Sequence, residues 1–342
     1  MDYNIVHRKE RRFMAIMSDE KCRQISLEPV NRVIDEIKSK KKSKVFLVGD
    51  MACGKSVVLK EYINGYNDPE HALIDATVRY GEFVQIPDSE LIRLFQTCLI
   101  IKKMLLFIKQ NHPQKYMECF VGLESRVDVI YRKVDLIYLV GNYNKKPERI
   151  DKVLLEHPEI LLEEFLSIAT NVLDYKTITL AIDDFDSIGS SSQTYQKYIY
   201  NVLSQYVGLL ATISDKKVVY SQERQNELSE DNDLVMVDYT KDVEVVKELM
   251  DRMNLREMIF SGKMKYRMPI SLVIKDETIA SMIEKTNGSM FDMAHAVREL
   301  YRKMDELTPA EYDQYLLHFI DTEINKNPIF TGFIVPERKL HI

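Results

Sequence analysis

Hydrophobic residues follow two patterns along the chain, and the alternation of these patterns predicts the fold class. Short apolar runs are typical of buried strands, and they occupy residues 44–48, 71–78, 177–186, 216–222 and 233–240. Apolar positions spaced three and four residues apart predict amphipathic helices at residues 26–38, about 191–213 and 241–254. Because strands alternate with helices, we expect an α/β fold with a parallel sheet in three layers.

Two further regions are helical throughout. Residues from about 89 to 174 give apolar stripes with charged opposite faces, which predicts a long helical insertion. Residues 275–324 predict three helices, separated by Asn287-Gly288 and Thr308-Pro309. We therefore expect four parts: an N-terminal arm (1–25), an α/β domain (26–255), a helical lid subdomain (256–326) and a C-terminal tail (327–342).

The segment FLVGDMACGKSVVLKEY (46–62) carries the most specific motif. Gly49, Gly54, Lys55 and Ser56 satisfy the pattern G-x-x-x-x-G-K-[ST] between a predicted strand and a predicted helix. In that setting backbone N–H groups and the helix N-terminus bind phosphate, Lys55 reaches the β and γ phosphates, and Ser56 ligates magnesium. The motif predicts ATP and Mg²⁺ as cofactors, bound by Gly49, Asp50, Met51, Ala52, Cys53, Gly54, Lys55, Ser56 and Val57. The alternative is an ordinary strand-helix corner with a coincidental Lys-Ser pair.

A second motif, TLAIDDFD (179–186), ends a predicted strand in carboxylates. A magnesium-nucleotide site of this kind needs such a strand, and we expect it to pair next to the first strand. Asp183 is the candidate magnesium residue, and Asp184 is the candidate for orienting or deprotonating the attacking water. Asp186 fits a helix-capping carboxylate equally well. Together the two motifs predict a P-loop NTPase in which Lys55 and Asp184 are catalytic.

Composition narrows the partners and the compartment. Asp and Glu (53) outnumber Lys and Arg (47), so the whole molecule offers no general field for a polyanion. If DNA binds, the cluster Arg8–Arg12 and the run Lys38–Lys44 are the candidate contacts. The 4 cysteines lack CxxC spacing and the 7 histidines are dispersed, which argues against a zinc site and a disulfide framework. We expect a cytoplasmic protein without membrane association, since neither a signal-peptide pattern nor an apolar run of spanning length is found.

The motifs and their order resemble the AAA+ ATPases, and within them the origin-recognition initiators and the STAND-like and transposition-regulator ATPases. The resemblance spans roughly residues 26–325. It rests on GDMACGKS and LAIDDFD, on a strand ending VVYSQER, on a fifth strand leading into DYTKDVEVVKELMDRM, and on the lid sequence TNGSMFDMAHAVREL. The first two are specific to P-loop NTPases, and the order of the rest points to AAA+.

The resemblance implies two more site residues. In that family a polar residue at the end of the fourth strand senses the γ-phosphate, and Gln222 aligns with it. Arg224 is the candidate for the arginine finger that a neighbouring subunit supplies, with a plain surface arginine as the alternative.

Three features depart from the family pattern. Asp184 stands where the family usually has Glu, Phe291 stands near the place of the lid arginine, and the next arginine is Arg298. Only NKNPIFTGFIVPERKLHI follows residue 324, so the winged-helix DNA-binding domain of initiators is not expected here.

The resemblance therefore implies an ATPase that acts as a nucleotide-dependent switch on a homo-oligomer or a partner protein, with DNA left open as a partner. Two alternatives remain. One is a small-molecule phosphotransferase, which needs a pocket with cationic clamps above the loop. The other is an ATP-binding adaptor with little hydrolysis, which Asp184 and the lid sequence favour.

Overall fold

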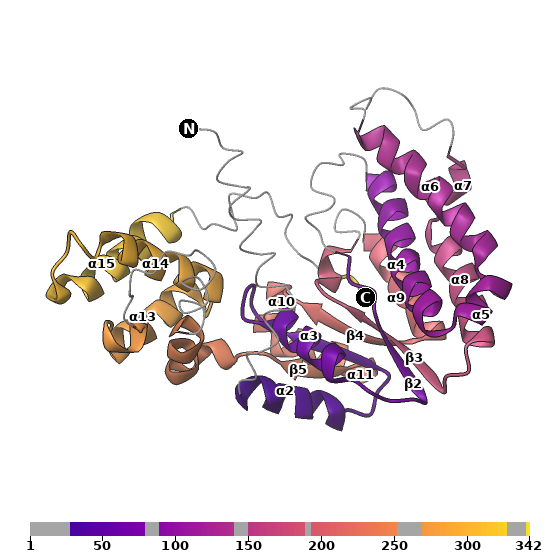
Figure 1. Ribbon diagram of the computed structural model, residues 1–342. Helices are drawn as coiled ribbons and strands as arrows, with labels where there is room; N and C mark the ends of the chain where they lie inside the picture. The colour runs from indigo at the N-terminus through magenta and orange to yellow at the C-terminus, as the bar shows by residue number, and fades with distance from the viewer. Residues whose placement is uncertain (1–27, 79–88, 140–149, 189–192, 252–268, 327–339) are drawn as a thin grey trace. The chain divides into compact units, whose positions relative to one another are not determined.

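The computed structural model describes residues 28–78, 89–139, 150–188, 193–251, 269–326 and 340–342 (Figure 1). These residues form two compact units. The first holds the described parts of 1–38, 50–61 and 237–334, and the second holds those of 39–49, 62–236 and 335–342. The predicted arm (1–25) and most of the predicted tail (327–342) lie outside the described residues, so the predicted boundaries of these parts stay predictions.

The second unit is built on a five-stranded sheet in which all neighbouring strands are parallel, in the order β2-β3-β4-β1-β5. The strands are β1 (Lys44–Val48), β2 (His71–Asp75), β3 (Thr177–Ile182), β4 (Gly208–Ile213) and β5 (Asp233–Met236). Successive residues of a strand face opposite sides of the sheet, and all six residues of β4 are buried. Both faces of the sheet are therefore covered, as expected of an α/β fold in three layers.

The predicted fourth strand is wrong. Residues 216–222 form the short helix α10 (Lys216–Tyr220) and the start of α11 (Gln222–Asp231), and the strand is β4, where we expected the end of a helix. Helix α10 forms because Asp215 caps it: the Asp215 Oδ1 accepts the N–H of Lys217 at 2.8 Å. Gly208 suits the strand, since a Cβ at this position would lie 2.7 Å from the Oγ1 of Thr179 on β3.

The pairing of the first and third strands was also predicted wrongly. β4 lies between β1 and β3 and pairs with both, so the strand that ends in Asp183 is one strand removed from β1. The expected pairing came from the motif and left no place for a strand between the two, whereas residues 208–213, assigned to a helix, form the strand that lies there.

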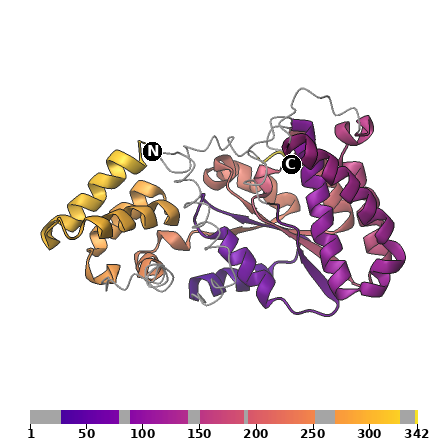
Figure 2. The same ribbon diagram turned by 45° about the horizontal axis from the view of Figure 1, so that its top comes forward.

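The described residues of the predicted insertion (about 89–174) are largely helical. They comprise α4 (Ser89–Asn111), α5 (Pro113–Cys119), α6 (Val121–Leu139), α7 (Lys152–Glu156) and α8 (Glu159–Val172), and α9 (Gln193–Tyr206) follows β3. Figures 1 and 2 show α4, α6 and α8 side by side, and α8 also contacts α9. Phe120, Phe165 and Leu94 are fully buried among these helices, and they share one core with the apolar side chains of β2, β3 and β4. None of the described helices is long and apolar enough to cross a membrane.

The first unit contains the three helices predicted near the C-terminal end. They are α13 (Asp276–Thr286), α14 (Met290–Lys303) and α15 (Tyr312–Phe319), and the last continues into a π-helical turn (Ile320–Ile324). Asn287 ends α13 in the left-handed conformation, and Thr308 and Glu311 form a capping box before α15, as the sequence indicates. Two more helical segments belong to this unit. One is α2 (Glu28–Ser39), of which all residues up to Lys38 are included, and the other is residues 243–251. The core includes Val246, Met282, Met293, Leu300 and Leu316.

Candidate functional site

The carboxyl ends of β1 and β4 mark the switch point of the sheet. These strands are neighbours, and the N–H of Gly49, just after β1, donates to the carbonyl of Ile213, the last residue of β4, at 3.3 Å. The chain goes from β1 to β2 at one edge of the sheet, whereas from β4 it goes to β5 at the opposite edge. Ligands of open parallel sheets bind where connections leave neighbouring strands in opposite directions. The residues that follow β1 and β4 are therefore the first candidates for ligand contact.

The loop after β1 is a tight turn that ends where α3 (Lys55–Gly65) begins. Ala52 has φ 61° and Gly54 has φ 97°, so two of its residues adopt left-handed backbone conformations. The N–H of Cys53 donates to the carbonyl of Asp50 at 3.3 Å. Backbone that alternates between left- and right-handed residues can turn successive N–H groups toward one side and bind an anion. The positive φ values of Ala52 and Gly54 are the feature that this loop shares with such a turn.

Lys55 crosses this loop. Its side chain is only 4% exposed, and its Nζ donates to the carbonyl of Asp50 at 2.6 Å and lies 3.9 Å from the Sγ of Cys53. Burial raises the pKa of the Cys53 thiol, so this group is neutral beside the ammonium. Ser56 is exposed in the first turn of α3. The ammonium of Lys55 is thus held on the loop that the sequence assigns to phosphate.

The carboxylates after β3 are held by a hydroxyl on the neighbouring strand. Thr212, fully buried in β4, donates through Oγ1 to the Oδ1 of Asp183 at 2.6 Å, and the same Oγ1 accepts the N–H of Asp184 at 2.7 Å. The N–H of Asp183 donates to the Oγ1 of Thr77, just after β2, at 3.1 Å. Asp184 has φ 55° and is partly exposed, as is Asp183. Two partly exposed carboxylates with fixed backbones therefore stand at the carboxyl end of β3.

Asp186 behaves as a structural residue. It is fully buried, and its Oδ2 accepts the N–H of Ser214, the residue after β4, at 2.8 Å. This bond ties the 3-10 turn Phe185–Ser187 to the end of β4. Through this bond Asp186 holds two segments together; it does not cap a helix, since α10 begins at Lys216 and is capped by Asp215.

The structure removes the geometric basis for Gln222 as a sensor, because Gln222 does not end a strand. It is exposed at the start of α11, and its Nε2 donates to Asn226 at 3.0 Å. Arg224 pairs with Glu227 at 2.8 Å, and its Nη2 lies 3.4 Å from the carbonyls of Leu340 and Ile342. Arg224 thus has partners within its own chain.

Ser214 and Asp215 stand where the fourth strand ends, and both are buried. Besides capping α10, Asp215 accepts the N–H of Leu340 on Oδ2 at 2.7 Å. The next residue, His341, donates its N–H to Gln196 of α9 at 2.5 Å. Thr212, Ser214 and Asp215 were not predicted from the sequence. The available signals were a threonine inside the apolar run LLATI and the helix-capping pair Ser-Asp before KKVVY.

The predicted magnesium residues fall in different units: Ser56 belongs to the first and Asp183 to the second. Within the described residues, no group of three or more His, Cys, Asp or Glu side chains is arranged to hold a metal ion.

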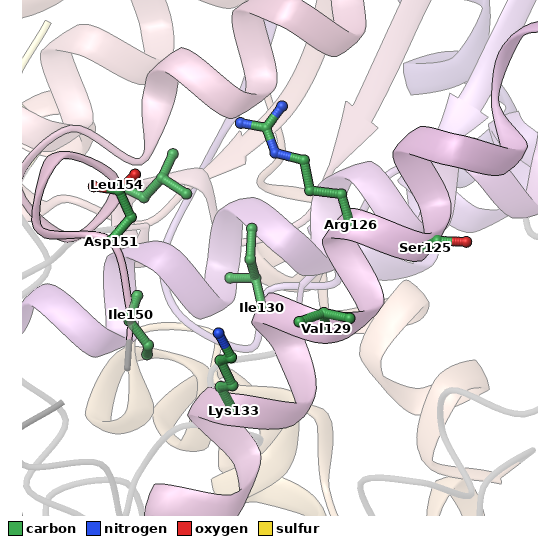
Figure 3. Close-up of a pocket in the computed structure, with 8 residues that line it drawn as sticks. All are labelled: Ser125, Arg126, Val129, Ile130, Lys133, Ile150, Asp151 and Leu154. Carbon is green, nitrogen blue, oxygen red and sulfur yellow. The ribbon is translucent and has the colours of Figure 1, made fainter. Parts of the chain in front are cut away.

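A separate hollow of about 440 Å³ lies in the insertion, between α6 and the segment that begins α7 (Figure 3). Four apolar and four polar or charged residues line it, and most of its exposed lining surface is apolar. These residues are Val129, Ile130, Ile150 and Leu154, with Ser125, Arg126, Lys133 and Asp151. Arg126 binds both carboxylate oxygens of Glu164 on α8, at 3.0 and 2.8 Å. Of the two cationic side chains that line the hollow, Arg126 and Lys133, Arg126 is thus paired with a carboxylate.

Comparison with models of known protein families and with curated protein sequences finds no match to this chain.

Proposed function

We propose that this chain is a P-loop ATPase of the AAA+ type, which binds ATP with Mg²⁺ on residues 49–57 and works as a nucleotide-dependent switch. The observation that carries the proposal is that the phosphate-binding motif lies at the switch point of the sheet. The motif GDMACGKS begins at Gly49, directly after β1, where the sheet has its switch point with β4. Phosphate binding at such a point is a general property of α/β sheets with a glycine-rich loop before a helix.

The roles follow from the chemistry of the side chains. The loop N–H groups and Lys55 bind the phosphates, and Ser56 and Asp183 hold the magnesium ion, which neutralises phosphate charge when bound. Asp184 orients or deprotonates the attacking water. Thr212 acts through Asp183 by fixing its carboxylate. Aspartate is one methylene shorter than the glutamate usual at this place, so we expect slow hydrolysis.

The output of the switch is a change in assembly or in a partner-binding surface. The insertion supports this part of the proposal, because it is much longer than the 2–6 residues of ordinary connections in α/β units. A DNA partner rests on the resemblance alone.

The test combines light scattering with phosphate release, for protein without nucleotide, with ADP and with ATP. We expect ATP to increase the mass of the assembly, Lys55→Ala to abolish this change, and Asp184→Asn to keep the assembly while phosphate release stops. Lys103→Ala, which removes an exposed lysine of α4, is the control and behaves as wild type.

Other outcomes separate the alternatives. A monomer in every state, with phosphate release only when a small-molecule acceptor is supplied, contradicts the switch and supports a phosphotransferase. Tight ATP binding with assembly but no phosphate release supports the adaptor. Absence of nucleotide binding by the wild type rejects the proposal as a whole.

A further inference from the structure

Tyr239 touches the candidate phosphate-binding loop within the first unit. It lies in a 3-10 turn (Tyr239–Lys241), and its hydroxyl donates to the carbonyl of Gly54 at 3.2 Å. A Cβ placed on Gly54 would lie 1.8 Å from this hydroxyl oxygen and 2.6 Å from the ring carbon that bears it. Glycine is therefore favoured at position 54 for two reasons: its positive φ, and the lack of space for a Cβ beside Tyr239.

The carbonyl of Gly54 is the first hydrogen-bond acceptor of α3. It accepts the N–H of Val57 at 2.9 Å and that of Val58 at 3.1 Å, so it points along the helix. In a planar trans peptide the N–H of the next residue points the opposite way. The N–H of Lys55 consequently points out of the N-terminal end of α3, toward the side where a helix binds anions.

Tyr239 adds a third bond to this carbonyl, from outside the helix, and so restricts rotation of the Gly54-Lys55 peptide. Burial raises the pKa of the Tyr239 hydroxyl well above its usual range, so it remains a proton donor at neutral pH. The next residue, Thr240, packs on Gly288: a Cβ there would lie 3.0 Å from the Oγ1 of Thr240. Tyr239 is thereby supported by the turn before α14.

The same turn touches the loop directly. The N–H of Met290, the first residue of α14, donates to the carbonyl of Ala52 at 3.3 Å. The carbonyls of Ala52 and Gly54 thus both accept bonds from residues outside the loop. Because both carbonyls are bonded from outside, the Ala52-Cys53 and Gly54-Lys55 peptides are held in place before any ligand arrives, which lowers the cost of ordering on binding.

We propose that Tyr239 is a positioning residue of the nucleotide site, whose hydroxyl holds the Gly54-Lys55 peptide with its N–H directed at the bound phosphate. This inference rests on the proposed function. It goes further by assigning a role to a residue outside the loop and outside the two motifs.

The experiment compares nucleotide affinity in three full-length proteins by calorimetry with ADP and Mg²⁺. Tyr239→Phe keeps the ring and removes the donor, so we expect its Kd for ADP to rise about 5- to 10-fold, the effect of one hydrogen bond. Replacement of Tyr239 by 4-aminophenylalanine restores an N–H donor, and we expect a Kd close to that of the wild type. Tyr198→Phe removes an exposed hydroxyl on α9 and serves as the matched control.

The outcomes distinguish this inference from the function on which it rests. If the wild type binds neither ADP nor ATP, the proposed function fails, and the role of Tyr239 fails with it. If the wild type binds ADP and Tyr239→Phe binds it equally well, only the positioning role is overturned. A loss in Tyr239→Phe that 4-aminophenylalanine does not restore shows a packing effect and also overturns it.

Discussion

One buried hydroxyl organises the carboxylates at the end of β3. Thr212 uses its proton for Asp183 and a lone pair for the N–H of Asp184, so a single side chain fixes both residues. A polar group that is fully buried has to find such partners, because leaving it unpaired costs about 1–3 kcal/mol. Thr212 therefore links the stability of the sheet to the geometry of the proposed active site.

Thr212→Val removes this hydroxyl while keeping the shape of the side chain. We expect the free energy of unfolding to fall by about 1–2 kcal/mol, because the Asp184 N–H loses its acceptor and the Asp183 carboxylate loses a donor. We also expect phosphate release to fall more than ATP affinity. Urea unfolding and steady-state phosphate assays measure the two effects. Thr170→Val, which removes a hydroxyl bonded within α8, is the control; equal phosphate release by both variants would contradict the role of Thr212.

Sequence motifs predict residues that would contact the ligand, but they do not predict residues that hold other protein groups in place. Lys55 was predicted from a motif of fixed spacing, and Asp183 was predicted from its place directly after an apolar strand. Thr212 and Tyr239 come from segments far from the motifs, and the structure alone brings Tyr239 to Gly54 and Thr212 to Asp183. The threonine inside LLATI marks Thr212 as unusual, but the sequence does not show what it contacts, since this depends on which strands and turns become neighbours.

At the scale of elements, most helices and four of the five strands follow from hydrophobic pattern alone. The fifth, β4, was missed because GLLATI is a continuous apolar run, and periodicity cannot separate a buried strand from part of a buried helix. The helix α10 was taken for a strand for the complementary reason, since KKVVY contains β-branched residues but is capped by Asp215. Because residues 216–222 were taken for the fourth strand, Gln222 was taken for the residue that ends it, and the sensor role was predicted there.

Gly208 tests the register of β4 against its neighbours. A Cβ at this position would lie 2.7 Å from the Oγ1 of Thr179 and 2.9 Å from the carbonyl of Ser43, so Gly208→Ala forces strands apart. We expect a loss of about 1–3 kcal/mol in the free energy of unfolding. The matched control is Gly122→Ala in α6, where a Cβ meets nothing within 4 Å, and we expect a gain of about 0.5–1 kcal/mol. Similar urea midpoints for the two variants would show that β4 is placed wrongly.

At the scale of the whole molecule, each of the two compact units is built from segments that are far apart in the sequence. The loop and the first part of α3, residues 50–61, belong with the C-terminal helices, whereas β1 belongs with the sheet. Contacts of Tyr239 and Met290 with the loop explain this grouping. A domain assignment from sequence follows the order of the chain and therefore keeps residues 50–61 with β1. Only contacts between distant residues, such as Tyr239 with Gly54, show that these residues pack with the C-terminal helices.

This grouping predicts which amides respond to nucleotide. When ADP and Mg²⁺ bind, hydrogen exchange should slow together at residues 50–58, 237–242 and 287–292, because these segments are linked through Gly54, Tyr239 and Met290. Ligand binding also stabilises the whole fold, by about 2.7 kcal/mol when the free ligand concentration is 100 times Kd, and this slows every amide that exchanges through global unfolding. The measurement therefore uses amides that exchange through local opening. Such amides at the ends of α4 and α8 should change little, and Lys55→Ala should abolish the response everywhere. Slowing that is confined to residues 50–58 would mean that the loop responds alone, and that the contacts of Tyr239 and Met290 do not carry the signal to the helices of the first unit.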